Sequence, residues 1–116
     1  MTDTDLDFIS NETLNFIVDP ELGIVPKSKN DMTVGDYQFL HFKNCKLVFS
    51  SKMSFNDCVF ENSEIVGQTT GVKFKNCRFI KLKVSDMSGC QFVGSSLVGC
   101  NIDSSKNVFK KTVVEP

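Results

Sequence analysis

The chain has 116 residues, of which 41% are hydrophobic and 23% are charged, and its formal net charge at pH 7 is -1. This length predicts one domain, and the ordinary composition excludes intrinsic disorder. No apolar run approaches the roughly 20 residues needed to cross a bilayer, so we expect no membrane association. Because the first residues lack the positive start and apolar stretch of a secretory signal, we expect a cytoplasmic, reducing environment.

Charge is distributed unevenly along the sequence. Residues 1–36 contain eight acidic and two basic residues, whereas residues 37–116 contain six acidic and eleven basic residues. We divide the chain into an acidic N-terminal cap segment (1–33), a repeat body (34–105) and a C-terminal strand or tail (106–116). The acidic segment could lie against the basic body, or a partner could use either half.

The N-terminal segment carries the apolar residues of an amphipathic element. Leu6, Ile9, Phe16 and Ile17 fall on one side of a helix, so we predict a short helix from Leu6 to Val18, with a pair of strands as the alternative. A stacked repeat needs its open end covered, because the last coil otherwise exposes apolar side chains and unpaired strand edges. This segment has the position and the apolar content of such a cap.

From Tyr37 onward the large apolar residues recur in steps of five. The series are Tyr37, Phe42 and Leu47; Phe55, Phe60 and Ile65; Phe74, Phe79 and Val84; and Met87, Phe92, Leu97 and Ile102. Small residues, mostly cysteine and serine, stand two positions before many of them. A helix needs steps of three and four and a flat strand needs steps of two. Steps of five therefore predict a chain that alternates short strands with corners.

A longer match lies over the same stretch. Phe42-Lys-Asn-Cys45 aligns with Phe74-Lys-Asn-Cys77, and the match continues at the same offset, without a gap, as far as Gly67 and Gly99. Self-similarity at a fixed period predicts a stacked architecture in which each unit buries its apolar face on its neighbour.

Four consecutive runs of five residues carry a family resemblance. They are Ser85-Asp-Met-Ser-Gly89, Cys90-Gln-Phe-Val-Gly94, Ser95-Ser-Leu-Val-Gly99 and Cys100-Asn-Ile-Asp-Ser104. These runs resemble pentapeptide repeats, whose pattern is a small residue, then Asp or Asn, then Leu or Phe, then two variable positions. The resemblance covers roughly Val34 to Ser104.

The resemblance implies the fold class that we predict: an all-β protein, a short right-handed parallel β-helix with an N-terminal capping segment. In a pentapeptide-repeat solenoid the coils are quadrilateral, and the large and small residues of each repeat point inward. The steps of five slip near 50–52, 68–71 and 82–84. We expect bulged, irregular coils there, and a different right-handed β-helix is the alternative.

The tail alternates apolar and basic residues from Val108 to Lys111, as an edge strand does. It could cap the C-terminal end of the solenoid or pair with the same strand of another subunit. A homodimer through the C-terminal end is therefore one of our hypotheses, since short solenoids have weakly protected ends.

No arrangement of nucleophile and base can be argued, so we predict that the protein is not an enzyme and uses no metal or other cofactor. The five cysteines contain no Cys-x-x-Cys pair, which indicates small buried hydrophobes rather than metal ligands. His41, the single histidine, precedes the inward-facing Phe42 and is expected to face solvent. Gly89, Gly94 and Gly99 recur where corners need left-handed backbone, not as a phosphate loop.

One surface feature recurs in both copies of the doubled stretch. Lys43 is equivalent to Lys75, and Lys46 is equivalent to Arg78. If equivalent positions stack, these residues form a basic ridge that could bind phosphates or an acidic protein surface. The alternative is an outward face that lysine keeps soluble. Single-stranded nucleic acid would require exposed aromatic residues between the cations, but we expect Phe42, Phe74 and Phe79 to occupy core positions.

Our leading hypothesis is a rigid, non-enzymatic β-solenoid that binds a protein partner through Lys43, Lys46, Lys75 and Arg78 and modulates or inhibits it. Pentapeptide-repeat proteins include imitators of duplex DNA that engage type II topoisomerases. Their surfaces are strongly acidic, so only the segment 1–33 could imitate DNA here. Composition and small size suit a phage-encoded inhibitor of a host nucleic-acid-processing factor. The alternatives are a structural subunit of a virion-like assembly and a binder of nucleic-acid phosphates.

Overall fold

The computed structural model of the protein consists of short strands joined by tight corners. The described residues are 7–11, 13–17, 31–33, 36–49, 53–67, 69–84, 87–103 and 105–116. Every regular element within these ranges is a β-strand of two to five residues. The same ranges contain no helix of the length and apolar character that crossing a membrane requires.

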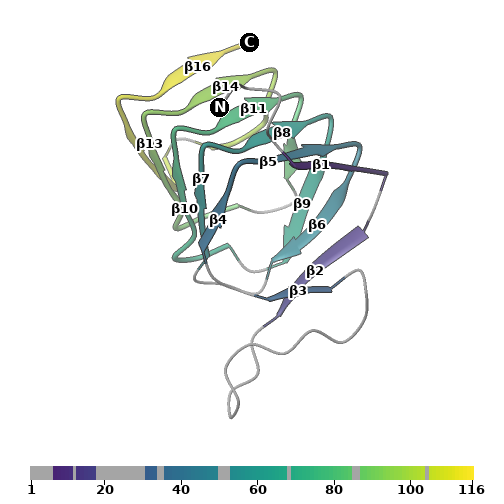
Figure 1. The fold of residues 1–116 in the computed structure, drawn as a ribbon. Helices are drawn as coiled ribbons and strands as arrows, with labels where there is room; N and C mark the ends of the chain where they lie inside the picture. The colour runs from purple at the N-terminus through teal and green to yellow at the C-terminus, as the bar shows by residue number, and fades with distance from the viewer. Residues whose placement is uncertain are drawn as a thin grey trace.

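The strands pair in parallel and form three sheets around one core (Figure 1). In pairing order, sheet I consists of β15 (Val108–Lys110), β13 (Gln91–Val93), β10 (Lys73–Lys75), β7 (Ser54–Asn56) and β4 (Asp36–Gln38). Sheet II consists of β1 (Asp7–Ser10), β5 (Leu40–Lys43), β8 (Val59–Glu61), β11 (Arg78–Ile80), β14 (Ser96–Val98) and β16 (Val113–Glu115). Sheet III consists of β12 (Lys83–Val84), β9 (Glu64–Gly67), β6 (Lys46–Phe49), β2 (Thr13–Ile17) and β3 (Asp31–Thr33).

From β4 to β14 the chain visits the three sheets in turn, and β15 and β16 then add one more strand to sheets I and II; this path makes the protein a β-solenoid. β4, β5 and β6 form one coil, and β7 to β9 and β10 to β12 form the next two. Along sheet I the register partners are Tyr37, Phe55, Phe74, Phe92 and Phe109, and their uneven spacing in the sequence shows that the coils differ slightly in length. The predicted all-β class with parallel, stacked coils is confirmed.

The helix predicted from Leu6 to Val18 is wrong, and the alternative of strands holds in the described part of this segment. β1 pairs with β5 of sheet II, and β2 pairs with β6 of sheet III, where Leu14 lies beside Leu47. Leu14 is buried in the core. An isolated helix of this length is marginal in water. When β1 and β2 pair with the edges of sheets II and III, their backbone groups form hydrogen bonds and apolar side chains such as Leu14 are buried. Tertiary pairing therefore decides the conformation of this segment.

The core is a set of stacked columns, one behind each sheet. The five-residue steps lead from sheet I to sheet II and on to sheet III, as in Phe55, Phe60 and Ile65, which are all buried. Rings stack along the columns, with centroids 5.4 Å apart for Phe55 and Phe74 and 4.9 Å apart for Phe60 and Phe79. Each such pair contributes about 0.5–1.5 kcal/mol beyond its buried area.

The remaining side of each coil, between sheets III and I, contains no strand among its described residues, and we call it the irregular side. Inward residues there, such as Leu47 and Phe55 or Ile65 and Phe74, are separated by more than a five-residue step. The predicted slips near 50–52 and 68–71 fall on this side, although residues 50–52 and 68 lie outside the described residues. The slip predicted at 82–84 is misplaced, because Val84 lies five residues after Phe79 and is the register partner of Ile65.

Corner residues adopt left-handed backbone, as predicted for Gly89, Gly94 and Gly99. The corner between sheets I and II has positive φ at Phe39, Asp57, Asn76, Gly94 and Lys111. The corner between sheets II and III has positive φ at Asn11, Asn44, Asn62, Lys81 and Gly99. Apart from Lys111, which lies in the last coil, each of these residues donates its N–H to a carbonyl oxygen of the next coil. The corners thereby extend the backbone ladder around the solenoid.

Candidate interaction surface

The first copy of the doubled motif forms a corner between sheets II and III. Lys43 ends β5, Lys46 begins β6, and Asn44 lies between them at a φ of 57°. In the next coil Glu61 is the register partner of Lys43, and Glu64 is the register partner of Lys46. Neighbouring strands are about 4.8 Å apart. Each lysine therefore has a carboxylate beside it, and the charge of this corner is locally balanced.

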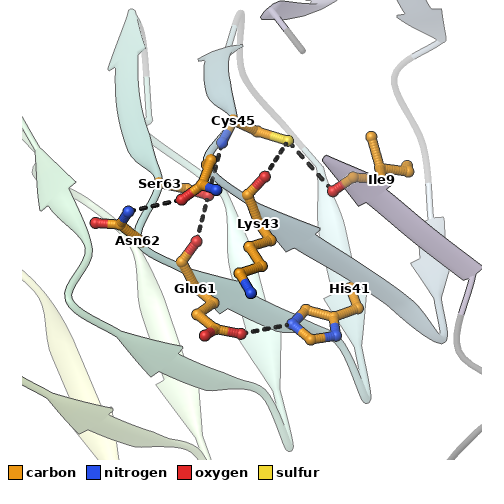
Figure 2. A network of polar contacts seen from close by, with 8 residues as sticks. Ile9, His41, Lys43, Cys45, Glu61, Asn62 and Ser63 are labelled. Carbon is orange, nitrogen blue, oxygen red and sulfur yellow. Dashed lines mark hydrogen bonds and ion pairs between the residues drawn. The ribbon is translucent and has the colours of Figure 1, made fainter. Parts of the chain in front are cut away.

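Further polar contacts tie this corner to the next coil (Figure 2). Asn62 Nδ2 donates to Asn44 Oδ1 over 2.6 Å, while His41 Nε2 and Glu61 Oε1 are 3.0 Å apart. The backbone N–H of Cys45 donates to Ser63 Oγ. His41 does lie on the outer face, as predicted, but it is half-buried and paired with Glu61. Nothing in the sequence pointed to this partner, because it belongs to the following coil.

The second copy forms a different corner, between sheets I and II. Lys75 ends β10 and Arg78 begins β11, and both side chains are exposed. The register partners of Lys75 are Asn56 and Val93. Those of Arg78 are Val59 and Ser96. No carboxylate occupies a register position beside either cation, in contrast to the corner of Lys43 and Lys46.

Two further lysines extend the second corner toward the C-terminus. Lys110 is the register partner of Val93, which places it in the same outward column as Lys75, about 10 Å away across two strand spacings. Lys111 has the next corner position, two coils beyond Asn76. Lys75, Arg78, Lys110 and Lys111 are all exposed, and we name this set the basic corner. Asp57, one coil before Asn76, is the nearest acidic corner residue.

The ridge predicted from Lys43, Lys46, Lys75 and Arg78 does not form, because the two copies do not stack. The offset between the copies is not a coil length, since Phe42 belongs to sheet II and Phe74 belongs to sheet I. The structure keeps Lys75 and Arg78 together and separates them from the other pair. Lys110 and Lys111 were missed, although the apolar and basic alternation of the tail was a signal for them.

The cysteines are free thiols that fill the inward side of corners, as predicted for small hydrophobes. Cys45, Cys58, Cys77 and Cys90 are buried, and Cys100 is half-buried. Burial raises the pKa of Cys90 to about 11. A hydrogen bond with Cys58, together with burial, holds the pKa of Cys77 well above its usual range. Cys77 and Cys90 therefore stay protonated at neutral pH, unlike nucleophilic cysteines. In the part of the chain that the structure describes, no three His, Cys, Asp or Glu side chains gather as a metal site would require.

The C-terminal end of the solenoid is protected unevenly. At the edge of sheet III, Asn101 covers the backbone of Val84, whose N–H donates to Asn101 Oδ1 and whose oxygen accepts from Asn101 Nδ2. Sheets I and II end in the edge strands β15 and β16. Val113 and Val114 of β16 are 57% and 54% exposed. Two strand edges with apolar side chains are thus open at this end.

A scan against models of known protein families finds no match to this chain, and a search of curated proteins finds none either.

Proposed function

We propose that this protein is a rigid, non-enzymatic β-solenoid that binds an acidic surface of a partner protein through the basic corner. The observation that carries the proposal is the set of four exposed cations with no carboxylate at the register positions beside Lys75 and Arg78. With Asp57 at the adjacent corner position, the four cations still leave this surface net positive, and a net positive surface attracts an acidic one and raises the rate of encounter with it.

The two strands that carry Lys75 and Arg78 also support this proposal. β10 is paired on both sides, with β7 and β13, and β11 is paired with β8 and β14. The inward residues of the two strands, Phe74 and Phe79, are fully buried with ring centroids 5.0 Å apart. The backbone under the cations is therefore held in place before binding, which reduces the ordering cost of association.

Affinity capture from a native host lysate, with and without nuclease, tests this function. Bait proteins are wild type, Lys75→Gln/Arg78→Gln and the matched control Lys43→Gln/Lys46→Gln. We expect one stoichiometric protein partner that survives nuclease treatment, is lost with the first variant and is kept with the control. Loss of all captured material on nuclease treatment would instead establish phosphate-backbone binding. Capture of the protein itself alone, as large assemblies, would establish the structural-subunit role.

We also propose that the coils are pentapeptide repeats that have been shortened on the irregular side. The five-residue steps between the three sheets support this proposal. A pentapeptide-repeat coil has four sides of five residues, or about 20 in all. Here every coil measured along sheet I is slightly shorter than that, because three sides are kept and the fourth is compressed.

A second proposal concerns self-association: β16 pairs antiparallel with β16 of a second chain. A two-fold axis through the open edge of sheet II brings Val114 beside its own copy and covers Val113. Analytical ultracentrifugation at tens of micromolar tests this arrangement. A dimer that Val114→Lys converts to a monomer supports it, and a wild-type monomer at these concentrations rejects it.

A further inference from the structure

Phe39 is an aromatic residue in a conformation that aromatic residues avoid. Its φ is 59°, and its side chain is 39% exposed. Left-handed backbone costs a bulky L-residue on the order of 1–2 kcal/mol, and Asn or Gly largely escape this cost. The other positions of the same corner column hold Asp57, Asn76, Gly94 and Lys111. Backbone conformation by itself therefore favours Asn or Gly over Phe at this position.

No ring stacking among the described residues holds Phe39 in this conformation. The ring pairs found among them include Tyr37 with Phe55 and Phe42 with Phe60, and none includes Phe39. Its backbone N–H donates to Asn56 O over 3.2 Å, a bond that a residue of any non-proline type would make. Residues in strained backbone conformations cluster at binding and catalytic positions.

Phe39 occupies the same edge of the solenoid as the basic corner. The corner column runs from Phe39 through Asp57 and Asn76 to Lys111, and N–H···O bonds of 2.9–3.2 Å join successive coils along it. At about 4.8 Å per coil, Phe39 lies about 10 Å from the level of Asn76 and about 19 Å from that of Lys111. One edge thus presents an exposed ring at one end and cations toward the other.

We propose that Phe39 is the apolar anchor of the partner-binding surface, and that the partner segment carries an apolar or aromatic side chain about 10 Å from a group of carboxylates. The inference rests on the proposed function of the basic corner. Rigid aromatic side chains lose little entropy on binding and are common among hot-spot residues. Asp57 separates the two features and repels carboxylates from the middle of the edge, so it fixes which way the segment lies.

An exposed ring beside cations also occurs in proteins that bind single-stranded nucleic acid. On this edge Asp57 stands between Phe39 and the cations, where a continuous phosphate backbone would pass. The Asp57 carboxylate forms no ion pair with another described residue. The charge pattern therefore favours a protein segment, whose acidic residues can be confined to one end.

Three defined polymers test the proposal with the purified full chain at low salt. They are poly-L-glutamate, a random copolymer of glutamate and tyrosine, and oligo-deoxythymidine. We expect wild type to bind the copolymer about tenfold more tightly than poly-L-glutamate, a hot-spot-sized effect. Phe39→Asn should abolish that preference and leave poly-L-glutamate binding unchanged. Lys75→Gln/Arg78→Gln should weaken binding of both acidic polymers.

The possible failures separate the two proposals. If wild type binds neither acidic polymer, the basic corner lacks the proposed function. If it binds both equally, only the role of Phe39 is overturned. Tighter, Phe39-dependent binding of oligo-deoxythymidine would replace the protein segment with a nucleic-acid strand.

The melting temperature is a second readout, which distinguishes a binding role of Phe39 from a structural role. Phe39→Asn relieves the backbone strain, so we expect it to melt several degrees above wild type while losing the preference for the copolymer. Phe39→Gly serves as a second variant with the same relaxed backbone. Lower melting temperatures for both variants would show that Phe39 stabilises the fold, which would overturn the proposal.

Discussion

The two copies of the Phe-Lys-Asn-Cys motif have the same interior and different exteriors. Phe42 and Phe74 are both fully buried, and both motifs turn at an asparagine with left-handed backbone. On the outside, Lys43 and Lys46 each have a glutamate as a register partner, whereas the register partners of Lys75 and Arg78 are neutral. A repeated motif thus specifies how the chain folds at a corner, and residues one coil away determine what that corner can bind.

The largest expected effect tests the shared interior. Phe42→Ala and Phe74→Ala should each lower the free energy of unfolding by about 3–5 kcal/mol, because each leaves a cavity in a ring stack. Guanidinium denaturation monitored by circular dichroism measures both. A cost below about 1.5 kcal/mol for only one of them would mean that the two interiors differ in packing.

The corner asparagines should differ by a smaller amount. Asn44→Ala and Asn76→Ala each introduce a residue that avoids left-handed backbone, at a cost of about 1–2 kcal/mol. Asn44→Ala also removes the acceptor of the Asn62 amide, which adds about 0.5–1.5 kcal/mol. Thermal melting of the two variants compares them directly. Equal losses would show that the amide contact contributes nothing to stability.

The smallest expected effect concerns the balanced charges. Lys43→Gln/Lys46→Gln leaves Glu61 and Glu64 without their neighbouring cations, and we expect a loss of about 0.5–1 kcal/mol in the free energy of unfolding. Lys75→Gln/Arg78→Gln removes mutual repulsion and should leave stability unchanged or slightly raised. Denaturation at low and high salt checks this, because screening should reduce the difference. A larger loss of stability in the second variant would contradict our interpretation that the charges are balanced at the corner of Lys43 and Lys46.

The solenoid could be predicted from the sequence because its strongest signal is local. A five-residue step from Phe55 to Phe60 to Ile65 reports a strand, a corner and the next strand, without knowledge of the neighbouring coil. The N-terminal strands were predicted only as the alternative to a helix. Leu14 is buried by pairing with Leu47, and that pairing depends on a sheet edge that a distant part of the chain forms.

The four residues of the predicted ridge lie at two separate corners for a related reason. Stacking depends on the length of a whole coil, and the irregular side varies that length from one coil to the next. The match between the two copies therefore could not show that Lys43 and Lys75 lie on different sheets. Nor could it show that Lys110 joins Lys75 in one column.

The most direct test of the central claim is a comparison of partner binding by the two charge-neutralised corners. Isothermal titration of the captured partner, or of poly-L-glutamate, would use wild type, Lys75→Gln/Arg78→Gln and Lys43→Gln/Lys46→Gln at two salt concentrations. We predict a loss of at least about tenfold in affinity for the first variant, with a weaker salt dependence, and nearly unchanged binding for the second. Equal losses for both variants, or a loss only for the second, would contradict the claim that the basic corner is the binding surface.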